Sequence, residues 1–198
     1  IKKVSNTTID PIALSIILNK LKKEKINDVI LEASSHGLKQ YRLDGLKFNT
    51  GIFTNLSHDH LDYHKTFNDY LKSKLSLFEK LLKKNGNIIT DKEIPQYRRI
   101  KKIAIKNQLN IEVISNNKSN LEIISHEYKD EKQIVHIKYN KNIYKFETSL
   151  IGKIQIRNIL MAIMAATKSN LNFKKIINTI DNLKPVSGRL EQIGIIKN

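Results

Sequence analysis

Short apolar runs alternate with helical patterns along the first half of the chain, and this alternation constrains the fold more than any other feature. Asp10 and Pro11 are typical of the N-cap and first position of a helix, which we expect to run to about residue 24. The runs DVILEAS (28–34) and TGIFTNL (50–56) are continuous apolar segments, as buried strands are. A long helix is predicted from about 66 to 84. Strands and helices in this order predict a parallel α/β sheet.

The second half of the chain predicts a change of architecture. It contains two further strands with a basic helix between them, then short alternating strands, then two helices. These segments are 85–90, 94–108 and 111–115, the region 121–148, and 154–168 and 173–183. The predicted fold class is therefore α/β, a mainly parallel sheet flanked by helices with a small antiparallel sheet near 121–148.

Composition narrows the function classes. The chain has 198 residues, 40% of them hydrophobic, which suits one globular domain. It has no cysteine, which excludes disulfides and thiolate chemistry within it, and no apolar run long enough to span a membrane. Residues 1–11 lack the apolar stretch of a secretory signal. A cytoplasmic protein without membrane partners is the expectation.

The net charge of +16 raises the alternative of a basic RNA-binding module. Only five of the 35 basic residues are arginine, and lysine, isoleucine and asparagine share A- and T-rich codons, so nucleotide bias explains the charge without a nucleic-acid partner. Phosphate and base recognition favour the fork of arginine. We therefore expect no nucleic-acid partner.

Polar residues follow both predicted strands of the first half. Glu32 and Ala33-Ser34-Ser35-His36-Gly37 end the first, and Ser57-His58-Asp59-His60 follows the second. Ligands of parallel α/β sheets bind at the carboxyl ends of the strands. These loops are thus the candidate site, although capping and turn formation would use the same residue types.

Lys74 lies in the middle of an apolar helical stripe. Helical spacing puts it among residues that we expect to be buried: Phe67, Tyr70, Leu71, Phe78, Leu81 and Leu82. Burial lowers the pKa of a lysine amine, and a neutral amine adds carbon dioxide to give an anionic carbamate. The simpler alternative is a lysine that extends its amine to solvent.

Three motifs in order carry a family resemblance. The run LEASSHGLKQYRLDGLKFNTGIFTNLSHDHLDYHKTFNDYLKSKLSLF, preceded by NTT at 6–8 and followed by LIGKIQIRN and VSGRLEQ, resembles the central ATP-binding domain of the Mur ligases. The likeness covers residues 6–193 and is closest to the branch that adds the third residue of the peptidoglycan stem peptide. It implies a P-loop-type α/β core and an ATP-dependent ligase that acts through an acyl phosphate. A folylpolyglutamate-type or other Mur-type ligase is the alternative within this class.

The resemblance implies a role for each matching residue. Glu32, His60 and carbamylated Lys74 would be catalytic and would hold Mg²⁺, an ion that prefers hard oxygen ligands. Asn158 and Arg189 would lie near the nucleotide, ATP. The residues implied to contact UDP-MurNAc-dipeptide are Asn6, Thr7, Thr8, Ser34, Gln40 and Arg42. The amino acid to be added, diaminopimelate or lysine, would be the other substrate.

The sequence departs from the family pattern at three points. Gln155 replaces the first of two asparagines, and the acidic pair after the next strand is half kept, as Asp91-Lys92. Gly152-Lys153 lacks the rest of a phosphate-binding loop, and no such loop occurs elsewhere in the chain. We therefore expect a piece of a longer enzyme, inactive alone, that lacks the N- and C-terminal domains. Its expected divisions are an incomplete central domain (1–184) and a hinge (185–198).

A dinuclear zinc hydrolase is the rival enzyme class. The pattern His58-x-His60-x-Asp62-x-His64 resembles its metal motif, but that motif needs histidine directly after the aspartate, where Tyr63 stands. The ligase hypothesis is preferred.

Overall fold

One mixed sheet organises the chain, and the computed structural model describes it over residues 7–57 and 60–186. Its six described strands follow sequence order, β1-β2-β3-β4-β5-β6. They are β1 (Phe48–Phe53), β2 (Leu82–Asp91), β3 (Asn110–Ser115), β4 (Leu121–Lys129), β5 (Lys132–Tyr139) and β6 (Asn142–Thr148). Neighbours from β1 to β4 are parallel, and β4, β5 and β6 are antiparallel. This confirms the predicted fold class.

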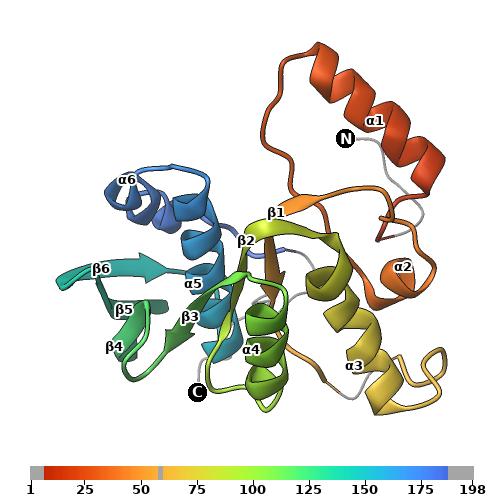
Figure 1. The fold of residues 1–198 in the computed structure, drawn as a ribbon. Helices are drawn as coiled ribbons and strands as arrows, with labels where there is room; N and C mark the ends of the chain where they lie inside the picture. The colour runs from red at the N-terminus through yellow and green to blue at the C-terminus, as the bar shows by residue number, and fades with distance from the viewer. Residues whose placement is uncertain (1–6, 58–59, 187–198) are drawn as a thin grey trace, which may run out of the picture.

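Helices lie on both sides of this sheet, and the first of them stands away from it (Figure 1). They are α1 (Pro11–Lys23), α2 (Ser35–Lys39), α3 (Phe67–Ser76), the π-helical turn η1 (Leu77–Leu81), α4 (Tyr97–Lys106), α5 (Lys153–Lys168), α6 (Phe173–Ile177) and the 3₁₀ turn η2 (Ile180–Asn182). The N-cap of α1 is Asp10, as predicted, because its carboxylate accepts from the backbone N–H groups of Ile12 and Ala13.

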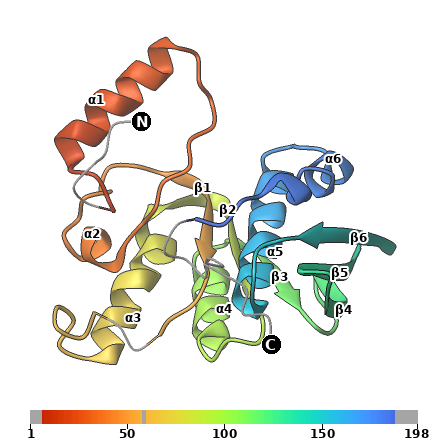
Figure 2. The same ribbon diagram turned by 180° about the vertical axis from the view of Figure 1, so that it is seen from behind.

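Two consecutive isoleucines of β2 define the two layers of the core. Ile88 packs with the apolar faces of α3 and α4, whereas Ile89 packs with α5 and the antiparallel strands. Successive side chains of a strand point to opposite faces, so the two isoleucines enter different layers. Both are fully buried, because each face of β2 is covered. The views from the two sides accordingly show α4 before the sheet in one and α5 before it in the other (Figures 1 and 2).

The predicted helix from 66 to 84 is shorter than expected. After α3 the backbone widens into η1, and the chain is already extended at Leu82, where β2 begins. The Asn85-Gly86 pair, expected to stop a helix, instead lies in an irregularity of β2, and Asn85 has a φ of 60°. The last predicted helix is also interrupted, forming α6 and η2.

The predicted buried strand at 28–34 is wrong. The described chain has no strand there, and the side chains of Val29 and Ile30 are 42% and 98% exposed. Among the described strands β1 pairs only with β2, and residues 28–34 form no ladder with its other edge. Without a neighbouring strand an apolar extended segment cannot bury both of its faces.

No helix within residues 7–57 and 60–186 is long and apolar enough to cross a membrane. The predicted boundary at 184/185 stays a prediction, because most of the proposed hinge lies outside the described residues.

Candidate functional site

Thr8 joins two separate segments at the start of the candidate site. Its side-chain hydroxyl donates to the backbone carbonyl of Glu32 at 2.9 Å and accepts from the backbone N–H of Ser34 at 2.8 Å. The two hydroxyls, Thr8 Oγ1 and Ser34 Oγ, are also 2.8 Å apart. Thr8 is buried, and its hydroxyl is engaged inside the protein. Thr8 therefore positions the turn after Glu32.

Ser34 in turn begins α2. Its hydroxyl accepts from the backbone N–H of Gly37 at 3.1 Å, as an N-cap does. Since Ser34 and Thr8 bond to each other, the cap of α2 and the preceding turn form one network.

Arg42, which follows α2 in sequence, also bonds to this network. Its Nη1 donates to the backbone carbonyl of Thr8 at 2.7 Å. Gln40 is exposed, and its Nε2 donates to the hydroxyl of Tyr63 at 3.1 Å. Thr7 is exposed beside this network, and Asn6 lies outside the described residues. Thus Thr8, Ser34 and Arg42 are brought together, while contact of these residues with a substrate stays a prediction.

The half-buried Lys74 reaches the carboxyl end of β1. Its amine donates to the backbone carbonyl of Asn55 at 3.0 Å and lies 5.2 Å from the ring centre of Tyr70 and 5.8 Å from that of Phe53. The surrounding apolar stripe is as predicted, with Tyr70 and Phe78 buried. The amine of this core-facing lysine therefore ends where the strand ends, at the edge of the sheet that the sequence indicated.

Three histidines gather between α2 and α3. The ring centre of His36 lies 5.0 Å from that of His60 and 5.4 Å from that of His64. His60 also contacts Tyr70 edge-on at 5.9 Å, so the Tyr70 ring lies against both His60 and Lys74. Two of the three predicted metal ligands are thus next to the same aromatic ring.

His64 is the buried member of this cluster. Its Nε2 is bonded to the Ser35 hydroxyl at 2.9 Å, its ring stacks on Tyr70, and its Nδ1 is buried without a hydrogen-bond partner. Burial lowers the pKa of His64, and the nearby positive charge of Lys39 lowers it further. The folded protein therefore favours the neutral imidazole.

The predicted magnesium set is Glu32, His60 and Lys74. Glu32 is exposed, and the described contacts use its backbone carbonyl. Among residues 7–57 and 60–186, no three His, Asp or Glu side chains come together to hold a metal. A carboxylate and a carbamate are donors that Mg²⁺ prefers, so this chemistry fits the ion if Lys74 supplies the second anionic oxygen ligand. The set stays a prediction, and the rival zinc motif includes His58, outside the described residues.

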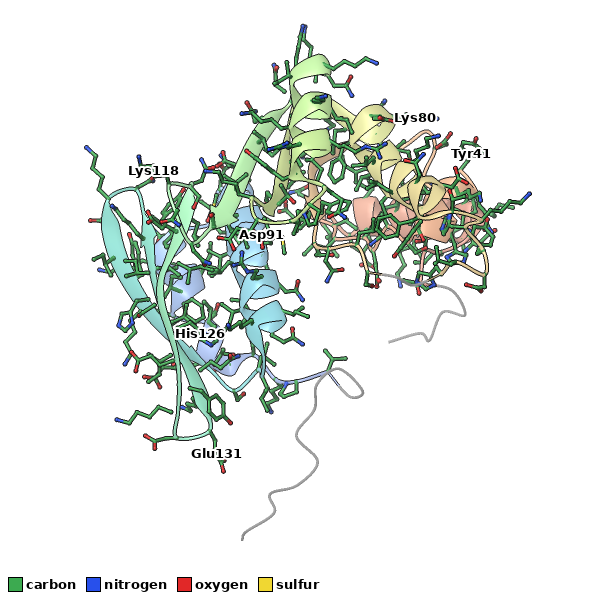
Figure 3. All side chains as sticks on the ribbon, turned by 90° about the horizontal axis from the view of Figure 1, so that it is seen from below. Tyr41, Lys80, Asp91, Lys118, His126 and Glu131 are labelled. Carbon is green, nitrogen blue, oxygen red and sulfur yellow. The ribbon has the colours of Figure 1, made fainter. Side chains whose placement is uncertain are left out.

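The carboxyl end of β2 has a feature that the sequence did not reveal. Arg157, in the second turn of α5, bonds through Nη1 to Asp91 Oδ2 at 2.5 Å and through Nη2 to Glu93 Oε2 at 2.7 Å. Asp91 ends β2, so the guanidinium fixes α5 to the carboxyl edge of the sheet. Figure 3 labels Asp91 at this junction. Lys92 stands where the family pattern has a second acid, and the second carboxylate bonded to Arg157 comes from Glu93, two positions after Asp91.

Asn158 and Gln155 flank this contact on α5, and both are half-buried. Arg189, the other residue implied for the nucleotide, lies outside the described residues. The roles of Asn158 and Arg189 toward a nucleotide therefore stay predictions.

A parallel sheet with polar residues at its carboxyl edge is typical of α/β proteins that bind a ligand at that edge. Comparison with known proteins identifies the family within this class. The Mur ligase middle domain matches residues 1–166, so the chain belongs to the Mur ligase family. The UDP-N-acetylmuramoyl-L-alanyl-D-glutamate–2,6-diaminopimelate ligase of Rickettsia bellii (strain RML369-C) is 36% identical over 187 residues, 94% of this chain and 39% of that protein.

Solved structures agree with this assignment. A UDP-N-acetylmuramoyl-L-alanyl-D-glutamate–2,6-diaminopimelate ligase superposes with a TM-score of 0.83 at 27% identity, covering 92% of this chain and 38% of that one. MurF ligase from Thermotoga maritima in complex with ADP has a TM-score of 0.64 at 14% identity, covering 82% and 39%, and shows the likeness of fold alone. The chain spans about two fifths of the length of the diaminopimelate ligases that it matches.

Proposed function

We propose that this chain is the central part of an ATP-dependent ligase that joins 2,6-diaminopimelate to UDP-MurNAc-L-Ala-D-Glu in peptidoglycan synthesis. The observation that carries the proposal is the likeness to diaminopimelate ligases along nearly the whole chain. Diaminopimelate, rather than lysine, is the amino acid in the names of these relatives. A cytoplasmic setting belongs to the same proposal, because ATP is a cytoplasmic substrate.

The proposed chemistry is formation of an acyl phosphate followed by amide-bond formation. The terminal carboxylate of the UDP-sugar dipeptide takes the γ-phosphoryl group of ATP, and ADP leaves. The amine of diaminopimelate then attacks the acyl carbon, and phosphate leaves from the tetrahedral adduct. Such reactions depend mainly on positioning and on stabilisation of charge.

One group of residues in this chain would bind magnesium and the UDP-sugar dipeptide, and another group would contact the nucleotide. Bound magnesium would neutralise charge on the phosphates and the carboxylate, and Glu32, His60 and carbamylated Lys74 would hold it. Thr8 and Ser34 hold the turn next to Glu32, and their mutual bond supports a fixed placement of that residue. Arg42 has a rigid, permanently charged guanidinium suited to an anionic group of the UDP-sugar dipeptide. Asn158 and Arg189 would contact the nucleotide.

The test joins this chain to the flanking parts of the Rickettsia bellii relative. We expect the 198-residue chain alone to release no phosphate from ATP, because it contains no phosphate-binding loop. The joined protein should form the amide with diaminopimelate and release phosphate in equal amount. A folded joined protein that binds ADP but ligates no amino acid would overturn the proposal. Turnover by the chain alone would overturn the expectation of a silent fragment.

A further inference from the structure

Arg157 is the centre of a charged network that we call the Arg157 clasp, made of Arg157, Asp91, Glu93 and Asn116. Its guanidinium bonds to both carboxylates, and Nη2 also donates to the side-chain oxygen of Asn116 at 3.3 Å. Asn116 returns a backbone N–H bond to Glu93 Oε1 at 2.8 Å. Three segments, the ends of β2 and β3 and the start of α5, therefore meet at one guanidinium.

The clasp is partly protected from water. The side chain of Asp91 is 5% exposed, that of Arg157 24% and that of Glu93 40%. Burial opposes ionisation of Glu93, but the N–H of Asn116, the charge of Arg157 and the Ser115 hydroxyl together lower its pKa. The charged form of Glu93 is thus favoured beside Arg157, and the Asp91 carboxylate is bonded to the same guanidinium.

The start of α5 has few polar contacts of its own. Its N-cap is Gly152, which has a φ of 97° and no side chain to accept from the first N–H groups. The first turn has no acidic residue, and Lys153 and Ile154 are exposed. The clasp therefore supplies the charged side-chain contact that ties this end of α5 to the sheet.

We propose that Arg157 is a positioning residue for the nucleotide: the clasp sets the place of the first turns of α5, and with them Asn158, at the carboxyl edge of the sheet. The proposal rests on the proposed ligase function. Arg157 also neutralises two carboxylates that would otherwise repel the anionic ATP. An error of about 1 Å in such a placement costs up to about 100-fold in rate.

The first experiment measures placement without any activity. Backbone hydrogen exchange of residues 156–161, whose N–H groups are bonded within α5, is compared in the 198-residue chain for the natural sequence, Arg157→Gln and the control Lys153→Gln. The control removes the same charge from an exposed side chain of the same helix. We expect exchange about tenfold faster in Arg157→Gln alone. Equal exchange in all three would overturn the clasp, whether or not the ligase hypothesis holds.

The second experiment measures the nucleotide in the joined ligase. Arg157→Gln should raise the KM for ATP by about tenfold or more, while the KM for the UDP-sugar dipeptide stays within about twofold. Arg157→Lys keeps the charge but not the fork, and should recover part of the loss. Adding Glu93→Gln to Arg157→Gln should also recover part, because it removes one unneutralised carboxylate.

The outcomes separate the two proposals. A natural-sequence ligase without activity counts against the ligase function, and the exchange result still decides the clasp. An active, folded Arg157→Gln ligase with an unchanged KM for ATP overturns the positioning role. If Arg157→Gln does not fold, Arg157→Lys decides instead: an unchanged KM for ATP overturns the role, and a raised one supports it.

Discussion

Thr8 lies so close to Gly37 that a Cβ on Gly37 would be 2.5 Å from the Cβ of Thr8. The other two side-chain atoms of Thr8 would be 2.6 and 2.7 Å away. Thr8 cannot move aside cheaply, because its hydroxyl is bonded to Glu32 and Ser34. Position 37 therefore requires glycine for space, and the close contact keeps the turn after Glu32 against the start of α2.

Gly37→Ala should destabilise the chain by about 1–3 kcal/mol, the usual cost of forcing extra atoms into a packed site. Urea unfolding gives the value. Gly45→Ala is the matched control, because Gly45 has a φ of 86° but an added Cβ there would meet nothing within 4 Å, so it reports backbone strain without a clash. That strain costs about 1–2 kcal/mol. In a Thr8→Gly background the Gly37→Ala cost should shrink, and an unchanged cost would show that Thr8 is not the obstacle.

Local signals of the sequence predicted most elements, and non-local contacts explain what they missed. The cap at Asp10 and the apolar stripe of α3 are set by neighbours in sequence, and both are confirmed. The pairing of Arg157 with Asp91 joins residues 66 positions apart, which no local pattern encodes. One signal was available: Arg157 is one of only five arginines in a lysine-rich chain.

Lys74→Ala in the joined ligase should abolish ligation, a loss of more than about 100-fold, if a carbamate on this lysine supplies a magnesium ligand. Added short carboxylic acids should restore part of the rate, since a small carboxylate can take the place of the carbamate. Lys72→Ala, on the exposed side of α3, is the control and should retain activity. Full activity of Lys74→Ala would contradict a catalytic role for Lys74 and would leave it a structural role, such as its bond to the carbonyl of Asn55.

Stability should fall as the pH drops below the ordinary histidine value of about 6.5, because of His64. Burial lowers its pKa in the folded chain, so below pH 6.5 the unfolded chain binds a proton that the folded chain refuses. The stability present above pH 6.5 is then lost progressively until the pH reaches the lowered folded pKa. Each unit of separation is worth about 1.4 kcal/mol.

The pH dependence is checked by urea unfolding at pH 7.5, 6.5 and 5.5. His64→Asn should flatten the dependence, because the titrating group is gone. His126→Asn, on β4 in the antiparallel part of the sheet (Figure 3), tests whether the loss of any histidine has this effect. Equal slopes for the natural chain and His64→Asn would contradict the assignment.

Ile30 and Ile88 together test the exposed placement of the segment 28–34. The pattern predicts a strand buried on both faces, whereas the structure leaves Ile30 98% exposed and Ile88 fully buried. Ile30→Ser should therefore change the free energy of unfolding by no more than about 0.5 kcal/mol. Ile88→Ser, the same change in the core, should cost about 3 kcal/mol or more, since it removes packing and buries a hydroxyl. Similar losses at both positions would contradict the exposed placement of Ile30.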